Sequence, residues 1–164
     1  MLTTQKKSLK SGKYVNTAYV DSIVRTYKQE RWVHNSARIG KEDSLSTWYS
    51  IEEVEEFINT AKMHGADGIK FYFAAYPSDF TEKPEYAGRQ TLALVATKSK
   101  EMEEGTGHKD IYVQDGDATT ILAYNFGKIC PPSCPVPPKP ADADDWGGIG
   151  ITIVDRGEQG MTLV

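Results

Sequence analysis

The sequence predicts an α+β fold: an antiparallel sheet of about four to six strands with two main helices packed on one face. Three observations lead to this prediction: two segments with helical spacing of apolar residues, two with strand-like alternation, and a composition able to form a core. The chain has 164 residues, of which 39% are hydrophobic and 10% aromatic. Disordered chains contain fewer such residues, so we expect most of this chain to fold.

The first helix is predicted from about Thr17 to Arg31. Its apolar residues recur at i, i+3, i+4 and i+7, the spacing of one helix face. They are Val20, Ile23, Val24 and Tyr27. Asn16 or Thr17 can serve as the N-cap, because either side chain can accept a bond from an unpaired amide. The polar stretch 34–45, which contains Gly40, predicts a loop after this helix.

The second helix is predicted over about residues 50–64 and begins with a capping box. Ser50 and Glu53 have the spacing at which each side chain accepts a hydrogen bond from the other residue's backbone amide. The apolar stripe of this helix consists of Val54, Phe57, Ile58 and Ala61. Gly65 is suited to the position just after the helix, where a left-handed backbone favours glycine.

Two segments, at about 68–76 and 90–98, alternate in the manner of strands. Both have apolar residues on both faces, which is typical of strands inside a sheet. We therefore expect them to pair antiparallel and to lie centrally. Further strands are predicted at 108–113 and, as a short one, at 48–49, while 119–126 fits either a strand or a short helix.

The composition changes near residue 130. Six of the eight prolines lie between 131 and 140, and this density predicts an extended polyproline II segment. A glycine-rich apolar run follows from Trp146 to Val154, in which every second residue is isoleucine as in a strand. These residues are Ile149, Ile151 and Ile153. A turn at 156–160 would allow 161–164 to pair back.

These patterns divide the chain into four parts. We expect a flexible basic arm over 1–14, an α+β domain over 15–128, a proline-rich segment over 129–145 and a C-terminal β segment over 146–164.

The net charge of −4 is unevenly distributed. Residues 1–41 contain nine Lys or Arg and two Asp or Glu, a net +7, so the remainder has a net −11. The basic residues near the N-terminus could bind nucleic acid weakly, and those considered are Lys6, Lys7, Lys10, Lys13 and Arg25. We favour a solvated arm, because an acidic body argues against a protein that wraps nucleic acid.

Neither a transmembrane helix nor a secretory signal is expected. No run of 18 apolar residues occurs, and no apolar segment follows the N-terminal lysines. A soluble protein in the cytoplasm is the resulting prediction.

Cys130 and Cys134 are the most distinctive local feature. Their spacing differs from that of a C-x₂-C redox pair. A structural zinc site needs about four Cys or His ligands, and the three histidines are distant in sequence. A local disulfide is sterically possible, but we favour a pair of thiols packed in the proline-rich segment. No cofactor or metal ion is expected.

No other motif predicts catalysis, since phosphate-binding, calcium-binding and nucleophile-elbow patterns are all absent or broken. Tyr72 and Tyr76 share one face of the 68–76 strand, with Phe71 and Phe73 on the other. Stacking of nucleobases on these rings is possible, but we favour packing in the core.

Four segments follow one another in a recognisable order. They are 48–53 (WYSIEE), 65–76 (GADGIKFYFAAY), 90–95 (QTLALV) and 130–135 (CPPSCP). This order resembles a group of small uncharacterised proteins common in Bacteroidetes genomes. The resemblance covers about residues 17–135 and implies no activity and no catalytic residues.

The hypothesis we favour is a non-enzymatic module for protein interaction or assembly. The C-terminal β segment could add a strand to the sheet edge of another subunit, with Cys130, Cys134, Trp146 and the three alternating isoleucines as candidate interaction residues. An equally open alternative is that this segment completes its own sheet. The second hypothesis is a small enzyme or ligand-binding protein with a pocket at Tyr72, Tyr76 and loop 77–89, and the third is the weak nucleic-acid binder.

Overall fold

The computed structural model describes residues 10–134 and 153–163. The predicted α+β class is confirmed. The N-terminal helix is longer than expected, because three helical elements follow one another without a break. They are α1 (Thr17–Tyr27), a π-helical turn (Lys28–Trp32) and α2 (Val33–Ile39). The side chain of Asn16 accepts a hydrogen bond from the Tyr19 amide (2.9 Å), as predicted for the N-cap.

The loop predicted over 34–45 is wrong for residues 34–39. This part of the helix has no buried residues, so its polar sequence suits a solvated helix and gives no apolar stripe to detect. Gly40 ends the helix in a left-handed conformation (φ 70°).

The second helix, α3 (Ile51–Met63), agrees with its prediction. The capping box is formed: the Glu53 amide donates to Ser50 Oγ (3.1 Å), and the Ser50 amide donates to Glu53 Oε2 (2.8 Å). The hydrogen bond from the Ser50 amide holds the pKa of the Glu53 carboxyl below its usual value, and the side-chain hydroxyls of Ser50 and Tyr124 lower it further.

The main sheet is antiparallel and has four strands in the described part of the chain. Its central strand is β3, which pairs with β2 along one side and with β4 and β7 along the other. The strands are β2 (Gly68–Ala75), β3 (Gln90–Met102), β4 (Gly105–Asp110) and β7 (Ala123–Tyr124). The predicted antiparallel pairing of the 68–76 and 90–98 segments is confirmed, with Gly68 opposite Thr97 and Ala75 opposite Gln90.

Three two-stranded sheets complete the described structure, all antiparallel. They are β1 (Ser46–Trp48) with β8 (Lys128–Cys130), β5 (Tyr112–Asp115) with β6 (Ala118–Ile121), and β9 (Ile153–Asp155) with β10 (Met161–Leu163). The strand predicted at 108–113 is divided between β4 and β5, and the ambiguous 119–126 segment contains strand rather than helix. The pairing back of 161–164 is confirmed for Met161–Leu163.

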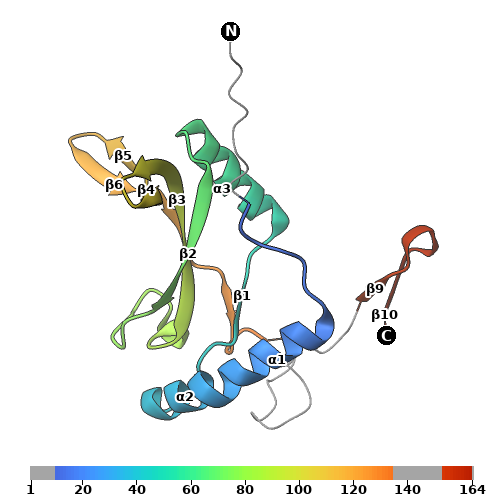
Figure 1. The fold of residues 1–164 in the computed structure, drawn as a ribbon. Helices are drawn as coiled ribbons and strands as arrows, with labels where there is room; N and C mark the ends of the chain where they lie inside the picture. Colours follow the sequence, from blue (N-terminus) through green and yellow to red (C-terminus); the bar gives the residue numbers. More distant parts are fainter. Residues whose placement is uncertain (1–9, 135–152, 164) are drawn as a thin grey trace.

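The helices lie on one face of the main sheet, as predicted (Figure 1). From α3, Phe57 and Ala61 are buried against Leu94 and Ala96 of β3, and Ile69 of β2 packs beside them. A second apolar cluster forms at the far end of the sheet. It consists of Tyr76, Phe80, Tyr86 and Ile129.

One prediction about the sheet is wrong: β2 is not a central strand. In the described part of the chain β2 pairs with β3 and with nothing on its other side. Phe71 and Phe73 are correspondingly exposed, at 57% and 85%, instead of packed in the core.

Candidate interaction surface

The open edge of β2 presents unpaired backbone groups. The Tyr76 amide donates to the Arg89 carbonyl (3.0 Å), in register with the β2–β3 pairing. Because hydrogen-bonded pairs alternate along an antiparallel ladder, every second residue counted back from Tyr76, such as Ala74 and Tyr72, also bonds to β3. The other residues of β2 therefore direct their amides and carbonyls to the open side. These are Ile69, Phe71, Phe73 and Ala75.

This edge lacks the features that usually prevent strand addition. Natural edge strands are commonly short, charged, bulged or interrupted by proline. β2 is eight residues long and contains no proline, and its only charged residue is Lys70. The side chain of Lys70 is engaged on the sheet face, where its Nζ lies 2.7 Å from Asp110 Oδ1. Nothing in β2 itself therefore blocks a further strand.

An apolar groove of about 670 Å³ lies beside Phe73, between the sheet and α1. Its apolar lining comes from α1, from β2 and β3, and from the residue that precedes β1. These residues are Ile23, Val24, Tyr27, Leu45, Phe73 and Leu92. Arg31, Thr47 and Gln90 give it a polar rim.

A second, smaller hollow of about 310 Å³ lies at the other end of β2, between that strand and α3. Ile58, Ala61 and Ile69 supply its apolar surface. Ile69 and Phe73 are four residues apart on one face of β2, which corresponds to about 13 Å along a strand. A strand added beside β2 would thus direct alternate side chains toward both hollows.

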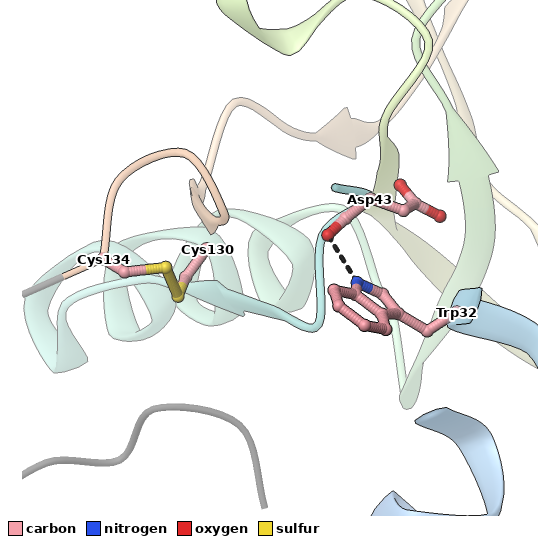
Figure 2. Close-up of a disulfide and its surroundings, with 4 residues drawn as sticks. All are labelled: Trp32, Asp43, Cys130 and Cys134. Carbon is pink, nitrogen blue, oxygen red and sulfur yellow. Dashed lines mark hydrogen bonds between the residues drawn. A yellow bond between two sulfur atoms is a disulfide. The ribbon is translucent and has the colours of Figure 1, made fainter. Parts of the chain in front are cut away.

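Asp43 is a buried carboxylate that fixes the wall of the groove. Its Oδ1 accepts hydrogen bonds from the amides of Gln90 (2.6 Å) and Ser44 (2.8 Å), and its Oδ2 accepts one from Asn35 Nδ2 (3.1 Å). The Asp43 carbonyl accepts from Trp32 Nε1 (2.7 Å), which ties the π-helical turn to the same loop (Figure 2). The loop before β1, the helix and the start of β3 therefore form one hydrogen-bonded unit.

Tyr27 joins α1 to this unit. Its hydroxyl donates to Gln90 Oε1 (2.5 Å). Burial raises the pKa of the Tyr27 hydroxyl, and the charge of Asp43 raises it further. The phenol therefore remains a neutral donor at physiological pH and holds α1 at the distance from β3 that leaves the groove open.

Cys130 and Cys134 form a disulfide, seen in Figure 2. The pair of thiols favoured from the sequence is therefore wrong, because the turn over 131–133 brings the two Cα atoms to 4.9 Å, within the range of a disulfide. Cys130 ends β8, and its carbonyl accepts a hydrogen bond from the Leu45 amide (2.7 Å). The bridge thus anchors the start of the proline-rich segment to the strand pair β1–β8.

Of the remaining predicted interaction residues, the structure describes the backbone of one. Ile153 is the first residue of β9. Trp146, Ile149 and Ile151 lie outside the described residues.

The two tyrosines of the predicted pocket lie in different surroundings. Tyr72 is exposed, and its hydroxyl donates to Asp110 Oδ2 (2.7 Å). Tyr76 is buried among aromatic rings and donates to Asn125 Oδ1 (3.0 Å). A hollow of about 470 Å³ does lie beside Tyr76 and loop 77–89, but Tyr72 is not part of its lining, which contains no Asp or Glu.

The basic residues proposed for nucleic acid do not converge in the described structure. Lys6 and Lys7 lie outside the described residues, and Lys10 and Lys13 are in the extended stretch before α1. Arg25 is paired with Asp21 on the same helix (3.1 Å).

The described residues form neither a metal site nor a membrane-spanning helix. No group of three or more His, Cys, Asp or Glu residues is arranged to hold a metal ion there. Within the same residues, no helix is both long and apolar enough to cross a bilayer.

Comparison with known proteins does not add a relative: no protein-family model, curated protein or solved structure matches this chain significantly. The site must therefore be interpreted from its own geometry.

Sequence reasoning missed both the open edge and the groove. The alternation of β2 describes its two faces, whereas an edge is defined by which strand lies next to it. The sequence did contain one indication. A strand with apolar residues on both faces needs other elements to cover both faces, and the apolar stripe of α1 can cover only part of one face.

Proposed function

We propose that this protein is a non-enzymatic interaction module that binds an extended peptide segment by β-strand addition at the open edge of β2. One observation supports this most strongly. An eight-residue apolar strand has four residues with outward-facing backbone groups, two exposed phenylalanines and, among the described residues, no strand along its outer edge.

In strand addition the backbone hydrogen bonds provide affinity, and pockets for alternate side chains provide specificity. The edge of β2 supplies the first through Ile69, Phe71, Phe73 and Ala75. The groove beside α1 and the hollow beside α3 supply the second. We therefore expect a partner segment in which every second residue, on the side that faces the groove and the hollow, is apolar.

Two further predictions from the sequence remain proposals. Membership in the Bacteroidetes group is one, and residence in the cytoplasm is the other. The Cys130–Cys134 disulfide counts against the proposal of the cytoplasm, because cytosolic thiols are normally kept reduced.

The proposal is tested with a capped seven-residue peptide in which isoleucine alternates with threonine between terminal lysines. The protein is held at nanomolar concentration and the peptide is titrated in excess. Phe73→Lys places a charge at the edge and beside the groove, and we expect it to weaken binding at least tenfold. Tyr72→Lys is the matched control, because it adds the same charge to the other face of the same strand.

A second control separates strand addition from general apolar binding. The same peptide with alternate amides N-methylated keeps its side chains but loses donors along one edge, and we expect it to bind at least tenfold more weakly. Absence of binding while the Phe71 and Phe73 amides exchange fast, or equal binding to both lysine variants, would show the proposal to be wrong.

A further inference from the structure

The C-terminal β segment of this chain fits the requirements of the β2 edge. The partner needs apolar side chains at every second position, spaced to reach the groove and the hollow about 13 Å apart. Ile149, Ile151 and Ile153 have this spacing, with the outer two four residues apart, as are Ile69 and Phe73. The residues between them are Gly150 and Thr152, which are small and uncharged.

The described part of the tail does not occupy its own β2. β9 and β10 pair with each other and form no ladder with the main sheet. In Figure 1 this hairpin lies away from β2 and β3. A β9–β10 hairpin that pairs only with itself also leaves its outer edges available for extension of a sheet.

The chain between the domain and this segment is long enough to reach a neighbouring molecule. Cys134 is anchored to the domain by its disulfide, and fourteen residues separate it from Ile149. At about 3.1 Å per residue, fourteen extended residues can span up to about 43 Å. That exceeds the radius of gyration of a domain of this size, about 15 Å.

From these observations we infer that the occupant of the β2 edge is the segment Ile149–Leu163 of a second copy of this chain. This inference rests on the proposed function and names its partner. Each copy has one donor segment and one acceptor edge, so reciprocal exchange closes a symmetric dimer.

The test uses sedimentation velocity on the full-length chain with point variants. We expect the unmodified protein to form a dimer. Phe73→Lys, which blocks the acceptor edge, and Ile151→Lys, which blocks the donor segment, should each be monomeric. Thr152→Lys is the matched control on the opposite side of the donor segment and should remain dimeric.

Mixing the two blocked variants gives the sharpest result. Phe73→Lys still has an intact donor, and Ile151→Lys still has an intact acceptor, so we expect an equimolar mixture to form a heterodimer with one strand addition. A dimer that persists in either variant alone, or a mixture that remains monomeric, would overturn the inference.

The failure of this inference can be distinguished from failure of the proposed function. A monomeric full-length protein that still binds the alternating peptide in a Phe73-dependent manner would overturn only the second-copy assignment. A second result would also overturn only the second-copy assignment: a monomer whose Phe71 and Phe73 amides are protected from exchange but become exposed in Ile151→Lys. In that case the chain's own segment would fill the edge. A monomer that binds no peptide, with both amides exposed, would overturn both.

Discussion

β2 and β3 both have apolar residues on both faces, but their surroundings differ. Leu94 and Ala96 of β3 are fully buried, whereas Phe71 and Phe73 of β2 are exposed. The difference lies in their neighbours, since within residues 10–134 and 153–163 β3 is paired on both sides and β2 on one. This difference is the basis of our proposal that another segment completes the sheet at β2.

The largest expected effect comes from the residue that anchors the start of β3. Asp43→Ala removes the acceptor for the Gln90 amide and for two other donors in a buried site. Unpaired buried donors cost about 1–3 kcal/mol each, so we expect a loss of about 3–5 kcal/mol of unfolding free energy in urea. Asp43→Asn keeps one oxygen acceptor and should lose markedly less; equal losses would argue against the hydrogen-bond explanation.

A comparison of the two strands by truncation should give the next largest effect. Leu94→Ala creates a cavity in the core and should cost about 3 kcal/mol. Phe73→Ala removes a larger side chain but one that is 85% exposed, and should change stability by less than about 0.5 kcal/mol. Similar losses of unfolding free energy in urea for the two variants would contradict the exposed position of Phe73.

The smallest expected effect is a pH dependence at the face of β2. The hydrogen bond from Lys70 Nζ lowers the pKa of the Asp110 carboxyl, and that from the Tyr72 hydroxyl adds to it. A carboxyl with a lowered pKa in the folded state stabilises the protein above its unfolded pKa, about 3.9, and loses that contribution as the pH falls through the folded value.

Asp110→Asn should therefore be less stable than the unmodified protein at pH 7, and the difference should shrink below about pH 4. Thermal unfolding between pH 3 and 7 measures it. A difference that stays constant over this range would mean that the Lys70–Asp110 pair does not act through the charge of Asp110.

The sequence predicted those parts of the fold that depend on local patterns. The capping box of Ser50 and Glu53, the antiparallel pairing of the two main strands and the turn before Met161 all follow from short-range spacing. The extension of the helix to Ile39 was missed because a solvated helix has no apolar stripe. The Asp43 network joins residues 32–44 to Gln90, and single-sequence patterns contain no information about such distant partners.

Amide hydrogen exchange of β2, measured by NMR on the full-length Ile151→Lys variant, whose donor segment is blocked, tests the central claim most directly. Without peptide the Tyr72 amide, which bonds to β3, should exchange slowly, while those of Phe71 and Phe73 should exchange fast. Saturation with the alternating peptide should slow Phe71 and Phe73 at least tenfold and leave Tyr72 unchanged. Fast exchange of Phe71 and Phe73 at saturation would contradict strand addition at this edge.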